Sequence, residues 1–163
     1  MKRVDEQALE TNAPERYRYL REFIGFDASD EAAIHAAAPH LAPLIPAMVD
    51  QTYDQLLGYD CTARHFLPRQ HGYDGETPDS LEDLTADHKQ IQFRKEHLAR
   101  YLMQIVGHAY NDGMVRYLDM VGKIHTPAAG SREIDVPLGQ MNALMGLLSD
   151  LLVTAVLDSD MDA

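Results

Sequence analysis

A chain of 163 residues, 45% of them hydrophobic, is large enough for one domain with a sizeable core, which buries roughly 68–70% of the unfolded surface. The formal net charge of −12 argues against a nucleic-acid partner and against docking to anionic lipid, because both require clustered Lys and Arg. There is no run of about 18 apolar residues, no secretory signal, and a single cysteine, so we expect a cytoplasmic protein that does not span a membrane.

The first third of the sequence predicts short helices. Residues 1–14 are polar and unpatterned, which predicts a mobile arm ahead of a domain over residues 15–163. A helix is expected over 14–24, and Asp27 followed by Asp30 predicts the capped start of a second, which ends near the prolines at 39, 43 and 46. A third helix is expected over 46–57, with a core-facing stripe of Val49, Tyr53, Leu56 and Leu57.

The rest of the chain predicts three longer helices separated by loops. A loop over 68–79 precedes a helix over 86–106, whose inner stripe has Leu98 and whose residues Lys89, Arg94, Lys95 and Glu96 are expected to face mostly outward. A helix from about residue 110 to His125 follows, then a loop over 127–135 ending in a cap at Asp135. The last helix, over 136–157, is apolar nearly all the way round, and no strand is expected, so the fold class is all-α.

One histidine, His125, continues an apolar stripe. Met114, Leu118 and Val121 precede it at helical spacing, and Pro127 places it in the final turn of its helix. An imidazole on an apolar wall at a helix end is suited to ligate haem iron. On spacing alone, a core histidine bonded to a nearby carbonyl is the favoured alternative.

Other site motifs are weak or absent in the sequence. There is no His-Glu-x-x-His, Cys61-x-x-x-His65 stands alone, and no glycine-rich phosphate loop is present, so neither zinc nor a nucleotide is predicted. Without Cys-x-x-Cys-His, a haem would be held non-covalently. Tyr53 is most simply a packed core residue, although beside an iron its hydroxyl could donate to bound dioxygen, and Phe66 alone is an ordinary core aromatic.

Three blocks together resemble the protoglobins and the related sensor globins of bacterial signalling proteins. They are Tyr-Arg-Tyr-Leu-Arg-Glu-Phe-Ile-Gly-Phe-Asp over 17–27, Val-Asp-Gln-Thr-Tyr-Asp-Gln-Leu-Leu over 49–57, and Arg-Tyr-Leu-Asp-Met-Val-Gly-Lys-Ile-His over 116–125, with Val136-Pro137 after them. The resemblance covers residues 15 to 157. It implies a globin-like helical fold and a single haem b that reversibly binds diatomic gases (O2, CO, NO), for sensing or gas handling.

The resemblance also assigns residues to roles. His125 corresponds to the ligand of the haem iron, Tyr53 to the distal tyrosine, and Phe66 to the aromatic against the haem. Leu98 corresponds to the bulky residue over the iron. The pocket is expected to be completed by Tyr117, Val121, Met141, Leu144 and Leu147. Arg94, at the outward edge of its helix, is a candidate partner for a haem propionate.

The sequence departs from the family pattern in two places. Thr52 stands where a tryptophan often precedes the distal tyrosine, which predicts a roomier distal side. The chain also stops near Ala163, where the family continues into a further long helix, so the C-terminal H helix is expected to be missing or replaced by another chain. The surplus apolar surface of the last helix then predicts a homodimer, with the acidic tail over 158–162 at its rim.

Two other function classes stay open at the level of sequence. One is a haem-free helical interaction module, in which His125 is structural and the last helix binds a partner. The other is a haem enzyme, peroxidase-like or consuming nitric oxide, for which the sequence locates no acid–base pair. The presence of a Soret band separates the haem proteins from the interaction module.

Overall fold

The computed structural model describes residues 1–129 and 131–159, and throughout these residues the secondary structure is helical, without strands. This confirms the predicted all-α class. The elements in chain order are α1 (Glu6–Thr11), α2 (Ala13–Ile24), α3 (Ala28–Leu41), η1 (Ala42–Leu44), α4 (Ile45–Leu57), α5 (Asp60–Ala63), η2 (Arg64–Phe66), α6 (Lys89–Gly107), α7 (Asp112–Lys123) and α8 (Leu138–Asp158).

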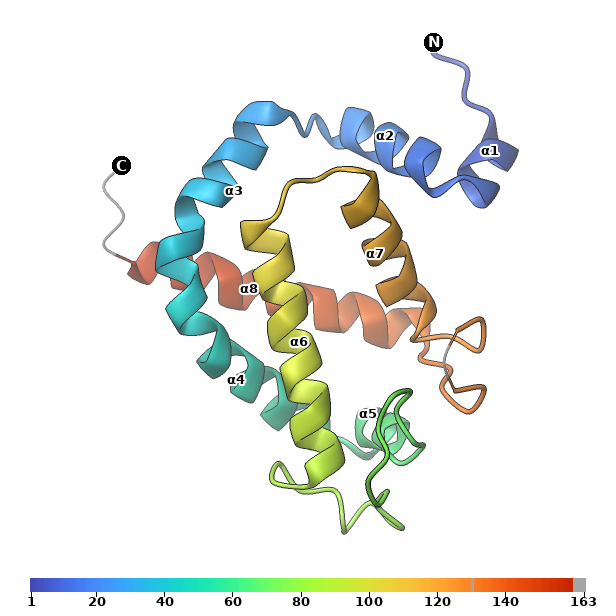
Figure 1. Ribbon diagram of the computed structural model, residues 1–163, viewed down its shortest axis with the longest axis vertical. Helices are drawn as coiled ribbons and strands as arrows, with labels where there is room; N and C mark the ends of the chain where they lie inside the picture. Colours follow the sequence, from blue (N-terminus) through green and yellow to red (C-terminus); the bar gives the residue numbers. More distant parts are fainter. Residues whose placement is uncertain (130, 160–163) are drawn as a thin grey trace.

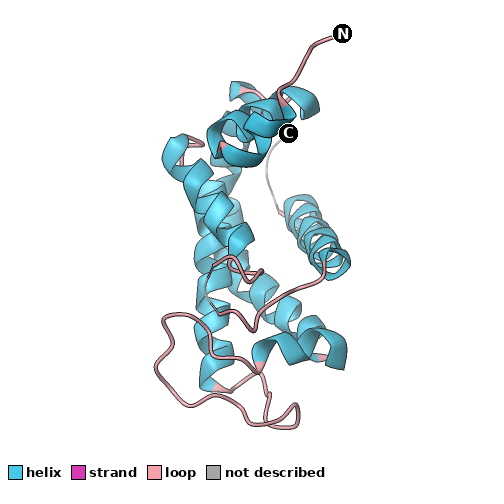
Figure 2. Ribbon diagram, turned by 90° about the vertical axis from the view of Figure 1, so that its right-hand side faces the viewer, coloured by secondary structure: helices cyan, strands magenta, loops and turns pink. Residues whose placement is uncertain are grey.

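The helices form crossed layers. Helices α3 and α4 follow one another in a curved arm, and α6 packs against both of them (Figure 1). Helix α8 packs against the same arm and crosses behind α6, set apart as a separate layer in Figure 2. Helix α7 packs against α2 on the other side of α6 from α4 (Figure 1). This arrangement leaves space bordered by α6, α7 and α8, where the site described below lies.

Short polar residues cap the starts of α1, α2, α3 and α7. Asp27 accepts a hydrogen bond from the Ser29 amide, and the carboxylate of Asp30 accepts one from the Asp27 amide, which completes the predicted capping box of α3. Asn111 caps α7 by accepting from two backbone amides. Gly25, at φ 74°, ends α2 in the left-handed conformation that glycine adopts without a Cβ penalty.

Several predicted boundaries are wrong by a few residues, each for a local reason. Helix α1 lies inside the stretch expected to be unpatterned, because Asp5 caps it. The predicted end of α3 near the prolines is confirmed, since the helix stops at Leu41, between Pro39 and Pro43. Asp135 does not cap α8, which starts after Pro137 without a side-chain cap. The boundary between an arm and a domain near residue 15 stays a prediction, and the acidic tail beyond Ser159 lies outside the described residues.

The core forms where α4 and α6 meet. Ile45 and Ile91 are fully buried there, as are the polar side chains of Thr52 and Gln90. Lys95 was expected to face outward, but only 9% of it is exposed, and its Nζ lies 2.9 Å from Asp50 Oδ1. Its long aliphatic stem is buried while its charge reaches a carboxylate at the surface, which is how a lysine can occupy an inner position.

Two helical stretches have the length and hydropathy that a membrane crossing requires. They are Ala28–Leu57, with a mean hydropathy of 1.3, and Leu138–Asp158, with 1.5. The first is divided into α3, η1 and α4 and packs on α6. Core helices of soluble proteins satisfy the same criterion, so the absence of a membrane span stays a prediction.

Candidate functional site

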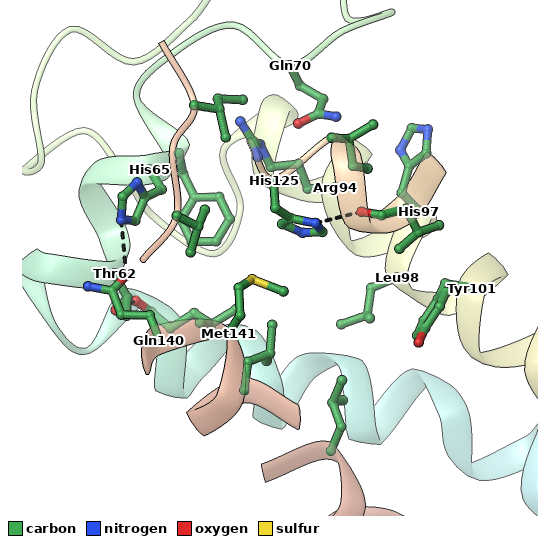
Figure 3. Close-up of a pocket in the computed structure, with 18 of the residues that line it drawn as sticks. Thr62, His65, Gln70, Arg94, His97, Leu98, Tyr101, His125, Gln140 and Met141 are labelled. Carbon is green, nitrogen blue, oxygen red and sulfur yellow. Dashed lines mark hydrogen bonds between the residues drawn. The ribbon is translucent and has the colours of Figure 1, made fainter. Parts of the chain in front are cut away.

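An apolar cavity of about 320 Å³ is enclosed mainly by α6, α7 and α8 (Figure 3). The end of α4 and the segment after α5 close one side of it. Among the described residues that line it, none is Asp or Glu. They are Tyr53, Leu56, Thr62, His65, Phe66, Gln70, Arg94, His97, Leu98, Tyr101, Tyr117, Met120, Val121, Ile124, His125, Ile134, Val136, Gln140, Met141, Leu144, Met145 and Leu148.

His125 lies in the wall of this cavity, just past the end of α7. The helix stops at Lys123, two residues earlier than predicted, and His125 follows in a turn. Its Nδ1 lies 2.8 Å from the carbonyl oxygen of Val121, and since a carbonyl only accepts, Nδ1 carries the proton (Figure 3). Nε2 is then the unprotonated nitrogen of the neutral ring. Burial lowers the pKa of His125, as does the charge of Arg94, while the bond to Val121 opposes this shift.

Tyr53 reaches the cavity from α4. Only 6% of the residue is exposed, and its ring packs on Phe66 with centroids 5.6 Å apart. Its hydroxyl forms no hydrogen bond with any described residue and is not among the polar atoms shielded from solvent, so it borders open space at the cavity. Burial raises the pKa of Tyr53, so the hydroxyl keeps its proton and can act as a donor. This hydroxyl is therefore available to a group inside the cavity.

Arg94 turns into the cavity rather than out of it, which corrects the expectation of an outward position. It precedes Leu98 by one helical turn, so the two share a face of α6. Its Cζ lies 5.0 Å from the centre of the Phe66 ring, and its Nη2 donates to the carbonyl oxygen of Pro68 at 3.2 Å. Burial lowers the pKa of Arg94 to about 10, which still leaves the guanidinium charged at neutral pH.

The family comparison is decisive for the identity of the fold. The family model described as Protoglobin matches residues 13–163, which is nearly the whole chain. This chain belongs to the protoglobin family. Comparison with curated proteins and with solved structures gave no match. Membership confirms the family resemblance of the three sequence blocks and identifies the crossed helical layers as a globin-type fold.

Most of the other residues predicted for the site line the cavity of this protoglobin. Leu98, Tyr117 and Val121 do so from α6 and α7, and Met141 and Leu144 from α8. Leu147 does not. The face of α8 toward the cavity consists of Met141, Leu144, Met145 and Leu148, spaced i, i+3, i+4 and i+7, and Leu147 falls outside that stripe.

Gln90 is a positioning residue that the sequence interpretation missed. It is fully buried, its Nε2 donates to the carbonyl oxygens of Phe66 at 2.7 Å and Pro68 at 3.3 Å, and its Oε1 accepts from the Gln70 amide at 3.1 Å. These bonds fix the backbone that carries Phe66 against the cavity. The helical spacing could have indicated its inward position, because Gln90 lies one turn before Arg94 and two turns before Leu98, on the same face of α6.

A polar pair closes another part of the wall. The ring of His65 lies 3.0 Å from Gln140 Oε1, and Gln140 Nε2 donates to the carbonyl oxygen of Cys61 at 3.1 Å (Figure 3). Burial lowers the pKa of His65. The pair ties the start of α8 to α5 and η2, so the protoglobin cavity is bounded by residues far apart in the sequence.

Proposed function

We propose that this protoglobin binds one haem b in the cavity, with the iron held by Nε2 of His125, and reversibly binds diatomic gases (O2, CO, NO) there. The single observation that carries the proposal is that His125, in the wall of the apolar cavity, keeps Nε2 unprotonated because its Nδ1 donates to the Val121 carbonyl. A metal-ligating histidine typically donates its other ring N–H to a carbonyl or carboxylate, which fixes the tautomer and the orientation of the ring.

The surroundings of His125 fit a haem. The volume of about 320 Å³ lies within the usual range for ligand pockets, about 300–1,000 Å³. Aliphatic side chains from α6, α7 and α8 provide the apolar surface that a porphyrin needs, and Phe66 offers it an aromatic face. The lowered pKa of His125 favours the neutral imidazole, the form that coordinates a metal.

Other residues would tune what binds. Haem iron in the cavity would supply the coordination site for the gas, and the polarity of its surroundings decides which ligand is favoured. The Tyr53 hydroxyl, which lacks a protein acceptor, supports a role as donor to bound dioxygen. Leu98 and Phe66 would form apolar walls, and Tyr117, Val121, Met141 and Leu144 would enclose the group on the sides of α7 and α8.

We place the protein in the cytoplasm and propose that it forms a homodimer through α8. Large side chains of this helix are exposed, among them Leu138 at 76%, Val153 at 57% and Leu157 at 77%. Monomeric proteins rarely leave extensive apolar surface in water, and a two-fold dimer covers the same face on both chains. Gas handling or gas sensing would then occur in a dimer, without nucleic acid or membrane.

The deciding experiment is the absorption spectrum of the purified protein, with the mass of the complex under native conditions. One haem per chain and a Soret band are expected, and reduction followed by carbon monoxide should shift the band. A colourless protein that fails to take up added haemin would overturn the proposal and leave the haem-free interaction module.

A further inference from the structure

The cavity contains a charge without a counter-ion. Arg94 forms no salt bridge with any described residue, and the described lining has neither Asp nor Glu, although the chain has 26 acidic residues. Its Nη2 has only a carbonyl oxygen as partner, and its Nε is shielded from solvent without any partner. Burying a charge without a paired charge is costly, and such groups are ordinarily paired.

A second donor lies on the same aromatic ring. The Arg94 guanidinium and the Tyr53 ring both pack on Phe66, at 5.0 Å and 5.6 Å between centres. Both side chains line the cavity, and the Tyr53 hydroxyl also lacks an acceptor. The charge of Arg94 also acts on Tyr53, so a guanidinium and a phenolic O–H share one part of the cavity. An anion can complete such a site, because hydrogen bonds between charged donors and anions are the strong ones.

We propose that the cavity binds a small monovalent anion, of the azide or nitrite type, between the Arg94 guanidinium and the Tyr53 hydroxyl. The inference rests on the proposed function, since the anion would be the ligand of ferric haem iron held by His125. The ferric protein then prefers anions, whereas the ferrous protein binds neutral gases at the same place. Arg94 is a specificity-determining residue in this assignment.

A haem carboxylate is the other anion that could meet Arg94. Its two carboxylates normally project toward the solvent, whereas the Arg94 Nε is shielded from solvent and its guanidinium is stacked on an inner aromatic ring. The positive charge of Arg94 also helps to lower the pKa of the His125 imidazole in the cavity wall. These observations favour a small anion inside the cavity as the partner of Arg94. The experiment below distinguishes this anion from a haem carboxylate.

The test titrates the haem-loaded ferric protein with azide and with nitrite and reads the Soret band. Arg94→Gln removes the charge, Arg94→Lys keeps it, and Lys89→Gln removes an equal charge from an exposed position on the same helix. The dissociation constant for azide should rise about tenfold or more in Arg94→Gln, change less in Arg94→Lys, and stay unchanged in Lys89→Gln. Carbon monoxide affinity of the ferrous protein should stay unchanged in Lys89→Gln. In Arg94→Gln it should change less than the azide constant does, since this ligand is neutral.

Haem retention provides the second readout, measured as transfer of haem to an excess of an apoglobin acceptor. Equal azide affinities in wild type and Arg94→Gln, with faster haem loss in the variant, would overturn the proposal and assign Arg94 to a haem carboxylate. Equal affinities with equal haem loss would also overturn it and leave Arg94 as a packing residue. A wild-type protein that takes up no haem would instead refute the proposed function, which separates the two failures.

Discussion

The imidazole of His125 is held by the carbonyl oxygen of Val121, 2.8 Å from Nδ1 and one helical turn earlier in the chain. This oxygen is free to accept because α7 ends at Lys123, and the amide that would continue the helix at position 125 bonds to Gly122 instead. The early end of the helix therefore orients the ring. If His125 were in the final turn of the helix, as the sequence predicted, its own backbone amide would bond to the Val121 carbonyl in place of its ring.

Replacing His125 with Ala should abolish haem retention or leave an iron that binds added imidazole in the vacated space. The reason is the surroundings of the other imidazoles in the cavity wall. His65 is engaged with Gln140, and His97, whose Nδ1 likewise donates to the carbonyl oxygen of Phe93 at 2.8 Å, is exposed, whereas His125 is half-buried. Absorption spectra with and without imidazole check this, with the exposed His71→Ala as control. An unchanged Soret band in His125→Ala would contradict the assignment.

Replacing Tyr53 with Phe should speed dioxygen release several-fold while barely changing carbon monoxide release. The substitution keeps the ring on Phe66 and removes only the hydroxyl, and a neutral hydrogen bond is worth about 0.5–1.5 kcal/mol. Flash photolysis or stopped-flow dissociation measures both rates. Equal dioxygen rates in the two proteins would reduce Tyr53 to a packing role.

Replacing Gln90 with Leu should lower the free energy of unfolding by about 2–4 kcal/mol, because three backbone groups near Phe66 lose a buried partner. The exposed Gln92, two residues later, bonds only to the Ala86 carbonyl, so Gln92→Leu is the matched control and should cost well under about 1 kcal/mol. Urea unfolding of the haem-free proteins measures both. Similar losses in the two variants would refute the positioning role of Gln90.

The haem-free protein should lose stability as the pH falls from ~7.5 to ~5.5. Burial lowers the folded-state pKa of His125 and of His65, so the unfolded chain binds more protons below its own histidine pKa of about 6.5. The stabilisation is complete above that value and is lost as the pH falls toward the folded pKa. Unfolding free energies of wild type and His125→Gln at both pH values check this. The loss should be smaller in the variant, and an equal loss would contradict the prediction.

The dimer proposal predicts a mass of twice 18.3 kDa by light scattering. Val153→Glu and Leu157→Glu place charges on exposed positions one turn apart on α8 and should shift the mass toward a monomer. Phe23→Glu, on the exposed face of α2, is the control and should leave the mass unchanged. A wild-type mass near 18.3 kDa would refute the proposal.

Periodicity predicted the helices and the inner faces well where apolar residues recur, as at Tyr53 and Leu98. It failed where polar side chains face inward. Arg94 and Lys95 were assigned to the outside by their charge, yet one enters the cavity and the other buries its stem. Their positions depend on tertiary partners, the Phe66 ring and Asp50, which spacing along one helix does not reveal. The missed role of Gln90 has the same origin, since its partners lie about 20 residues away across a loop.

The backbone of His125 is also joined to the start of α8, because the Val136 amide donates to the His125 carbonyl oxygen at 2.9 Å. The residue that would hold the iron is thus joined by one hydrogen bond to the segment that leads into α8, the helix whose exposed apolar side chains were described above. A small displacement of the imidazole, as gas binds or leaves, would pull on this backbone connection. The backbone of the cavity histidine and the start of α8 are therefore joined directly, although the loop between them lies outside the core of α4 and α6.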